Sequence, residues 1–325
     1  PSRLGHPRGR ATGDGEGAFV IPGRDGERQG FRDEAMRVDV ALDASGAAAY
    51  QGPRPASLYV ERVGPAGAPT VYYLHGGPGY NSASFREIAG GDLEDLDMIY
   101  ADQRGAGRST GEGGSDVALL AADVLAVMDA LDVRRAALLA HGFGALVAVR
   151  AARTSPERVT RLVLVNPWLS MPQLARDLHA EATGGQGRGE TPEGLEDPRA
   201  LVDEAFGLVN PKVLFDAMQF PSPKSRLFLE HVDAVALSGD VPDEVDDAVW
   251  LAEGIHDLRQ AVAAGVPVYL LSGRHDRTSY PGQAELVLEA APGATFALLD
   301  AGHYPWIDDE GFAETLKRAL TGDLG

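Results

Sequence analysis

The sequence contains no cysteine, comparatively few basic side chains and no long hydrophobic run. The absence of cysteine excludes disulfide bonds, thiol chemistry and cysteine-ligated metal sites. The 29 Lys and Arg residues stand against 48 Asp and Glu residues, which gives a net charge of −19 with His neutral. A field of that sign repels nucleic acids and anionic membranes, so neither is expected as a partner. No apolar stretch approaches the ~20 residues of a membrane-spanning helix.

The composition is that of a globular protein with a large core. Of the 325 residues, 44% are hydrophobic and 24% are charged, which argues against disorder and fibres. This length suits two units of ~150 residues, or one larger α/β domain that carries an insertion. Residues 1–30 are rich in Gly and Arg and lack the apolar segment of a signal peptide. We therefore expect a flexible N-terminal segment (1–30) on a cytoplasmic protein.

Short apolar runs alternate with helical patterns along the first half of the chain. The apolar runs that are typical of buried strands are Thr70–Leu74, Met98–Ala101, Ala136–Ala140 and Arg161–Val165. Amphipathic patterns such as Asp116–Leu131 separate them. Continuous apolar strands between such helices predict an α/β fold, with a mostly parallel sheet covered by helices on both faces.

This alternation stops near Trp168 and resumes near Asp257. The residues between them, 168–256, are helical and irregular, with many Pro and Gly. The pattern predicts a core made of residues 31–167 and 257–325, and a helical lid made of residues 168–256, which we call the insertion. Three histidines of the insertion, His179, His231 and His256, have no partner at the i,i+4 spacing of a zinc site, so no metal is predicted.

A glycine-rich string, HGGPG at residues 75–79, follows the run Thr70–Leu74. Ligands of parallel sheets bind at the carboxyl ends of the strands, so residues just after a strand are candidates for the site. Glycines allow backbone N–H groups to point into a cleft, where they can stabilise the oxyanion of an acyl intermediate. A simple tight turn is the alternative. His75 is expected to support this loop rather than to react.

A second string, AHGFG at residues 140–144, lies between a strand and a helix, the setting of a G-x-S-x-G nucleophile elbow. Gly142 stands where the nucleophilic serine is expected. Glycine tolerates the strained backbone of such a turn, so the turn is retained while the hydroxyl is lost. The preceding residue, His141, either reaches the cleft or packs in the core.

An acid and a histidine follow the last two predicted strands. Asp276 ends the string GRHD (273–276), and His303 ends the string AGH (301–303). Acid followed by histidine, after the elbow, is the chain order of a Ser…Asp…His triad in this architecture. We expect Asp276 to orient the ring of His303, and His303 to act first as a base and then as an acid.

These strings, together with DQRGAGRS at residues 102–109, resemble the α/β-hydrolase fold and, within it, the proline iminopeptidase family. They extend from residue 75 to residue 303 in that family's order. The resemblance implies an eight-stranded sheet, a helical cap, no cofactor, and removal of an N-terminal residue or acyl group from a small-molecule substrate.

The resemblance also implies roles for further residues. The N–H groups of Gly77 and Phe143 would build the oxyanion hole. Lid glutamates of the family bind the free amine of the substrate, and the loosely similar stretch 225–231 assigns that role to Glu230. Apolar residues of the insertion, Trp168 among them, either form its own core or line an apolar substrate cavity.

Three explanations of Gly142 compete. The natural protein carries a serine there and this chain is an engineered inactive form. Alternatively, Gly142 is native, and the chain binds a ligand or steers a non-hydrolytic reaction such as a cyclisation or rearrangement. In the third explanation, His303 and Asp276 activate a water. Because loss of the nucleophile costs ~10⁶ in kcat in subtilisin, covalent acyl transfer by this chain is not expected. The sequence leaves the substrate and the oligomeric state open.

Overall fold

The computed structural model describes residues 30–42, 54–184, 197–236 and 246–322. Apart from Gly30, the predicted N-terminal segment 1–30 lies outside the described residues. The strands are β1 (Phe31–Leu42), β2 (Arg54–Pro65), β3 (Thr70–Leu74), β4 (Asp97–Ala101), β5 (Ala136–His141), β6 (Val159–Val165), β7 (Val268–Gly273) and β8 (Thr295–Leu299). The four apolar runs that predicted buried strands thus correspond to β3, β4, β5 and β6.

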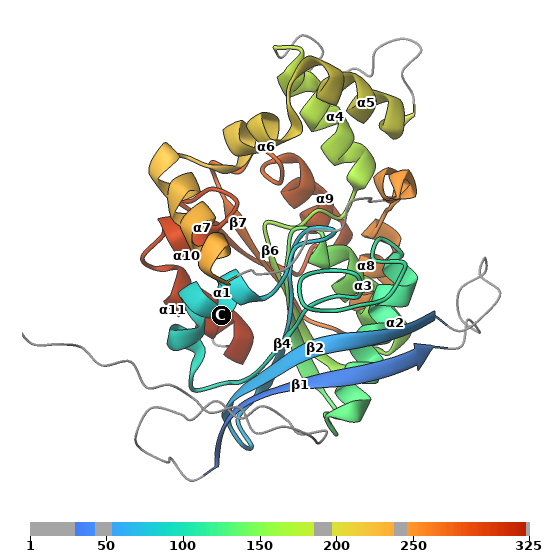
Figure 1. Cartoon of the computed structure of the whole chain (residues 1–325), viewed down its shortest axis with the longest axis vertical. Helices are drawn as coiled ribbons and strands as arrows, with labels where there is room; N and C mark the ends of the chain where they lie inside the picture. Colours follow the sequence, from blue (N-terminus) through green and yellow to red (C-terminus); the bar gives the residue numbers. More distant parts are fainter. Residues whose placement is uncertain (1–29, 43–53, 185–196, 237–245, 323–325) are drawn as a thin grey trace, which may run out of the picture.

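The strands form one eight-stranded sheet in the order β1-β2-β4-β3-β5-β6-β7-β8 (Figure 1). The strands β1 and β2 pair antiparallel, as do β2 and β4, whereas all pairs from β4 to β8 are parallel. The predicted fold class, an α/β fold with a mostly parallel eight-stranded sheet flanked by helices, is therefore confirmed. Parallel strands end at one edge of the sheet, so the loops that follow β3, β5, β7 and β8 meet there.

Helices cover both faces of the sheet. Those outside the insertion are α1 (Ala83–Ala89), α2 (Val117–Ala130), α3 (Gly144–Thr154), α8 (Ile255–Ala263), α9 (Gly282–Ala290), α10 (Pro305–Asp308) and α11 (Phe312–Thr321). The helices α2, α3, α8 and α9 pack on one face, and α1 and α11 pack on the other. No pattern in the sequence predicted α1.

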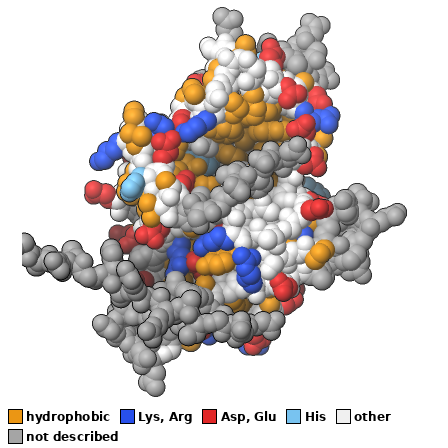
Figure 2. All heavy atoms as spheres, viewed as in Figure 1, with side chains coloured by type: hydrophobic (Ala, Val, Ile, Leu, Met, Phe, Trp, Pro, Cys, Tyr) orange, Lys and Arg blue, Asp and Glu red, His pale blue; other side chains and the backbone are white. Residues whose placement is uncertain are grey.

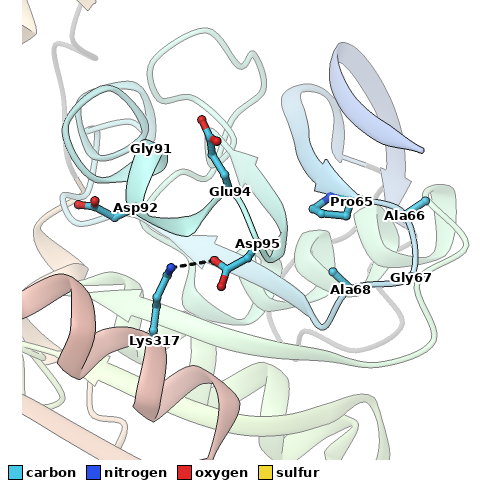
Figure 3. A pocket seen from close by; sticks show the side chains of 9 residues that line it. All are labelled: Pro65, Ala66, Gly67, Ala68, Gly91, Asp92, Glu94, Asp95 and Lys317. Atoms are coloured by element: carbon cyan, nitrogen blue, oxygen red, sulfur yellow. Dashed lines mark ion pairs between the residues drawn. The ribbon is translucent and has the colours of Figure 1, made fainter. Parts of the chain in front are cut away.

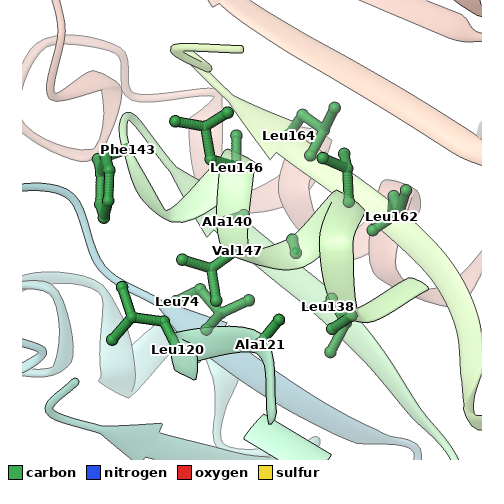
Figure 4. Packing of buried hydrophobic residues seen from close by; sticks show 14 of the residues in the cluster. Leu74, Leu120, Ala121, Leu138, Ala140, Phe143, Leu146, Val147, Leu162 and Leu164 are labelled. Atoms are coloured by element: carbon green, nitrogen blue, oxygen red, sulfur yellow. The ribbon is translucent and has the colours of Figure 1, made fainter. Parts of the chain in front are cut away.

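Alternate residues of the central strand β5 pack against the helices on the two faces of the sheet. Leu138 and Ala140 pack into the cluster that includes α2 and α3 (Figure 4). Ala137 and Leu139 pack into the cluster that includes α1 and α11. Successive side chains of a strand point to opposite faces. Because both faces are covered, every residue of β5 is buried, which explains why residues 136–140 of the strand are all apolar.

The described part of the insertion is helical and lies above the carboxyl edge of the sheet (Figure 1). It contains α4 (Met171–Ala182), α5 (Pro198–Leu208), α6 (Pro211–Gln219), α7 (Pro223–Ala236) and a 3₁₀ turn, η3 (Asp247–Leu251). The prolines do not interrupt these helices, because they occupy first-turn positions in α4, α5 and α6, where no N–H donor is needed. None of the described helices has the length and apolarity needed to cross a membrane.

Candidate active site

The glycine loop follows β3 and requires glycine at its centre. Gly77 has a φ of +125°, and a Cβ atom on this residue would lie 2.7 Å from the backbone N of Gly79 and 2.9 Å from that of Tyr80. Such distances are too short for any side chain, so only glycine allows the loop to fold back at this point. The loop borders the same cavity as His141 and His303.

The turn between β5 and α3 has the geometry of an elbow. Gly142 has a φ of +51°, and a Cβ atom on Gly144 would lie 2.4 Å from the carbonyl oxygen of Leu74 at the end of β3. Gly144 therefore allows α3 to begin directly against the glycine loop. The N–H of Phe143 stands at the amino end of α3, where the first N–H groups of a helix have no acceptor inside it.

Position 142 points at the imidazole of His303. An ideal Cβ on Gly142 would lie 3.4 Å from His303 Nε2 and 3.6 Å from its Cε1. A side chain fits at this distance, although its left-handed backbone costs ~1–2 kcal/mol for an L-residue. The structure therefore brings the expected nucleophile position and the imidazole together.

Asp276 and His303 form a buried pair. His303 Nδ1 donates to Asp276 Oδ2 at 2.7 Å, and both side chains are at most 3% exposed. The other carboxylate oxygen accepts hydrogen bonds from the backbone N (3.0 Å) and the Oγ1 (2.6 Å) of Thr278. With Nδ1 engaged by the carboxylate, Nε2 is the nitrogen that faces position 142.

Trp168 covers the face of the His303 ring. The two rings are stacked, with centroids 5.1 Å apart and planes at 24°. Trp168 Nε1 also donates to Thr278 Oγ1 at 3.2 Å, so the indole is linked to the side chain that holds Asp276. Trp168 lines the cavity, which is one of the two roles that the sequence left open for it.

Asn166 connects the loops that carry the pair, and the sequence analysis gave it no role. Its Nδ2 donates to the carbonyl oxygens of Gly302 and His303, both at 2.9 Å, and its Oδ1 accepts from the N of Gly273 at 2.8 Å. The residue is fully buried and has a φ of +44°. Asparagine tolerates this conformation better than most residues, and an Asn directly after a buried strand was the available signal.

His141 supports the same loop from the other side. Its Nε2 donates to the carbonyl oxygen of His303 at 2.9 Å. Burial, and then the proximity of His303, lower the pKa of His141 well below the ordinary histidine value, so the ring is neutral. His141 Nδ1 is buried beside Gly76 and has no hydrogen-bond partner among the described residues. His141 therefore both borders the cavity and holds the backbone of His303.

His75 supports the glycine loop, as predicted. Its Nδ1 donates to the carbonyl oxygen of Gly76 at 2.7 Å, while its Nε2 accepts from the N of Gln103 at 2.9 Å. Burial lowers the pKa of His75, which keeps the ring neutral and makes this pattern of one donor and one acceptor possible. Gln103 Nε2 returns a hydrogen bond to the carbonyl oxygen of His75. The string DQRGAGRS thus contributes to the site through its support of the glycine loop.

A cavity of about 530 Å³ connects these groups. Residues 76–79 and Tyr80 border one side, while His141, His303 and Tyr304 border another. Residues of the insertion also line it; they include four aromatic residues together with Met171, Pro211, Gln219, Asp247 and Val249. The volume is in the range that holds a drug-sized ligand.

The structure contradicts the prediction for Glu230. This residue lies on α7 with its side chain 40% exposed, and it forms ion pairs with Arg226 (2.7 Å) and Lys212 (2.8 Å). It is not among the described residues that line the cavity. The loose similarity did not establish which side chains of this stretch turn inward; the nearby Asp233 instead accepts a hydrogen bond from Tyr80 at 2.7 Å.

A second, more open cavity of about 630 Å³ lies at the opposite edge of the sheet. It is bordered by residues 65–68 before β3, by acidic residues before β4 and by Lys317, which pairs with Asp95 at 3.0 Å (Figure 3). The described residues that line this second cavity include no histidine and no residue of the elbow. The first cavity is therefore the candidate active site.

The sheet topology and this arrangement of elbow, glycine loop and Asp–His pair define the α/β-hydrolase class. Residues 69–197 match the family model described as alpha/beta hydrolase fold. A protein of Variovorax paradoxus (strain S110) named "Putative carbamate hydrolase RutD" is 30% identical over 263 residues, which cover 80% of this chain and 84% of that protein. The chain belongs to the α/β-hydrolase family.

Two further similarities cover different shares of the chain. The crystal structure of a proline iminopeptidase-related protein of Thermus thermophilus is 36% identical in sequence and has a TM-score of 0.71. This similarity covers 89% of this chain and 99% of that one. A protein of the same RutD name from Klebsiella pneumoniae (strain ATCC 700721 / MGH 78578) is 34% identical over 110 residues, only 40% of its length.

Proposed function

We propose that the site performs acyl chemistry on a small amide, carbamate or ester. In this proposal His303 is the base, Asp276 orients it, and the N–H groups of Gly77 and Phe143 form the oxyanion hole. The observation that carries the proposal is the direction of position 142, whose Cβ would lie 3.4 Å from His303 Nε2. Support for amide and carbamate substrates comes from the names of the two similar proteins that cover most of the chain.

The attacking group in this mechanism comes from outside the chain, because Gly142 has no hydroxyl. A water, or a nucleophile of the substrate itself, attacks the carbonyl carbon while its proton passes to His303 Nε2. The carbonyl oxygen becomes an oxyanion that accepts hydrogen bonds from Gly77 and Phe143. When the bond to the leaving group breaks, the proton on Nε2 passes to that group. Asp276 stabilises the charged imidazole between these steps.

The decisive experiment restores the missing hydroxyl. We expect Gly142→Ser to react with a fluorophosphonate and to hydrolyse amino-acid anilides or short esters, since the new Oγ would lie within reach of Nε2. Gly142→Ala is the matched control, because it introduces the same Cβ and backbone strain without a nucleophile. A Gly142→Ser protein that folds but neither labels nor turns over substrate would refute the proposal.

A second candidate function is a non-hydrolytic reaction, in which the substrate supplies the nucleophile and rearranges or cyclises. The missing hydroxyl and the largely apolar cavity favour it. Turnover by the unaltered chain would indicate a reaction without a covalent intermediate if it persists with serine-directed inhibitors and decreases in His303→Ala. That reaction would be either hydrolysis by water or the internal rearrangement. Turnover in H₂¹⁸O separates them: hydrolysis places ¹⁸O in the acid product, whereas an internal rearrangement does not.

A further inference from the structure

Four rings of the insertion, which we call the aromatic wall, line one side of the cavity: Trp168, Phe215, Phe206 and Trp250. Neighbouring rings are in contact distance along the whole series. The ring centroids of Trp168 and Phe215 are 6.0 Å apart, those of Phe215 and Phe206 are 6.3 Å apart, and those of Phe206 and Trp250 are 6.2 Å apart. The wall is therefore continuous from Trp168 to Trp250.

The aromatic wall begins beside His303, which is the general base of the proposed reaction. Trp168 stacks on His303, and its Nε1 is held by the hydroxyl of Thr278. A ligand whose carbonyl group lies beside His303 Nε2 thus meets the indole first and the remaining rings beyond it. The glycine loop also lines the cavity and offers mainly backbone there, while Tyr80, His141 and Tyr304 add further rings to the lining.

Three of the four rings, Phe206, Phe215 and Trp250, pack against the buried core and still keep part of their surface exposed, whereas Trp168 is only 7% exposed. The insertion has a buried core of smaller residues, with Leu201, Val202 and Ala175 in one cluster. Phe206 and Trp250 pack against that cluster and are still only half-buried, as is Phe215. Hydrophobic side chains also gather over the insertion in the space-filling view (Figure 2). A contiguous apolar surface left open beside a reactive group is typical of a binding site.

We propose that the aromatic wall recognises a substrate with a flat aromatic acyl group, about the size of two fused rings, attached to the reacting carbonyl. Aromatic rings attract one another in stacked or edge-on geometries at centroid separations of ~4.5–7 Å, the spacing already used between the rings of the wall. A ligand of this size suits the cavity of about 530 Å³. The placement of the carbonyl rests on the proposed function, but the recognition of the ring does not.

The test compares two amides with the same carbon skeleton, naphthalene-2-carboxamide and decahydronaphthalene-2-carboxamide. The saturated compound is not flat and has no π system, yet it is at least as apolar, so burial of apolar area alone does not favour the aromatic compound. We expect isothermal titration calorimetry on the unaltered chain to give about tenfold tighter binding of the naphthalene compound. Equal or tighter binding of the saturated compound would overturn the proposal.

Variants locate the effect on the wall. Phe215→Leu keeps an apolar side chain but removes a ring, so we expect it to reduce the preference for the naphthalene compound about fivefold and to leave the saturated compound nearly unchanged. Phe228→Leu is the matched control: Phe228 lies on α7, is 46% exposed and is not among the described residues that line the cavity. A preference unaffected by Phe215→Leu would also overturn the proposal.

Failure of this inference can be separated from failure of the proposed function. Binding of the two amides requires no catalysis, whereas labelling of Gly142→Ser by a fluorophosphonate requires no aromatic substrate. Selective binding without labelling would retain the aromatic wall as a recognition surface and reject the acyl chemistry. Labelling without selective binding would retain the acyl chemistry and reject the aromatic wall as a recognition surface.

Discussion

At the scale of single residues, the site depends on glycines that serve different purposes. Gly77 and Gly144 are required by close backbone contacts, whereas a side chain at Gly142 would meet the imidazole of His303 at ordinary contact distance. The available space therefore does not require glycine at residue 142, and a side chain there is disfavoured only by the modest strain of the φ of +51°. This difference explains why restoring a serine at residue 142 is a feasible experiment.

The close contact at Gly144 makes a testable prediction. Gly144→Ala would place a Cβ 2.4 Å from the carbonyl oxygen of Leu74, so α3 or β3 must shift. We expect a loss of about 3 kcal/mol in the free energy of unfolding, measured by urea denaturation. Gly293→Ala is the control, because its Cβ would have no neighbour within 4 Å. Equal stability of the two variants would contradict this account.

Asn166 gives a prediction about positioning. Asn166→Ala removes both donors to the carbonyl oxygens of Gly302 and His303 and leaves those buried acceptors with fewer partners. In a Gly142→Ser background we expect the rate of fluorophosphonate labelling to fall at least ~10-fold, since small displacements of a catalytic group have large effects on rate. The circular dichroism spectrum should be unchanged. An unaltered labelling rate in a folded protein would show that Asn166 does not position His303.

At the scale of secondary-structure elements, one carboxylate ties four strands together. Asp97 at the start of β4 accepts hydrogen bonds from Arg32 of β1, Arg62 of β2 and Thr70 of β3, at distances from 2.7 to 3.2 Å. Burial alone would raise the pKa of Asp97. The hydrogen bonds from Arg62 and Thr70 and the charges of Arg62 and Arg32 outweigh burial, so the pKa lies below the ordinary value. Asp97 thus stabilises the antiparallel edge of the sheet in its charged form.

The sign of this pKa shift predicts a pH dependence. A carboxyl group whose pKa is lower in the folded state contributes stability above its unfolded pKa of ~3.9 and loses that contribution as the pH falls through the folded value. We expect Asp97→Asn to lose about 3 kcal/mol of unfolding free energy at pH 7, and the difference from the unaltered protein to shrink below about pH 4.

The control for this prediction is Asp129→Asn. Asp129 pairs with Arg158 on the surface and is 67% exposed, so we expect a change below about 1 kcal/mol. Denaturation curves at several pH values measure both variants. A constant difference between Asp97→Asn and the unaltered protein at all pH values would contradict the assignment.

At the scale of the whole molecule, the insertion is tied to the loops that carry Asp276 and His303. The carbonyl oxygen of Gln219 at the end of α6 accepts from the N of His303 at 2.8 Å, and that of Met218 accepts from the N of Arg277 at 2.9 Å. The guanidinium of Arg277 also bonds the carbonyl oxygen of Ala217 and pairs with Glu181 of α4. A movement of α6 would therefore disturb the Asp–His pair.

Arg277→Ala tests this coupling. Because the guanidinium is partly exposed, we expect the free energy of unfolding to change by no more than about 1 kcal/mol. Amide hydrogen exchange in α6 should nevertheless accelerate several-fold, since the helix loses the hydrogen bond from the guanidinium to the carbonyl oxygen of Ala217. Arg259→Ala, which breaks an exposed pair with Glu289 away from α6, is the control. Equal exchange rates in α6 for both variants would argue against the link.

Much of this protein follows from its sequence without any tertiary information. Both faces of the sheet are covered, so each of the central strands β3 to β6 contains a run of mostly apolar residues that can be recognised in the sequence. Since parallel strands end at one edge, the residues after them, including Gly142, Asp276 and His303, were expected near one another. The glycine at residue 142, where the pattern predicts a serine, is likewise a property of the sequence alone.

Only the tertiary structure decided how distant segments face one another. It turned Glu230 outward to pair with Lys212 and Arg226, because the rotation of α7 is set by packing against α1 and α10 and not by the helical pattern of its residues. It also gave Asn166 its partners, Gly302 and Gly273, more than a hundred residues further along the chain. Local periodicity determines which elements form, whereas such contacts depend on surfaces that exist only after the elements have packed.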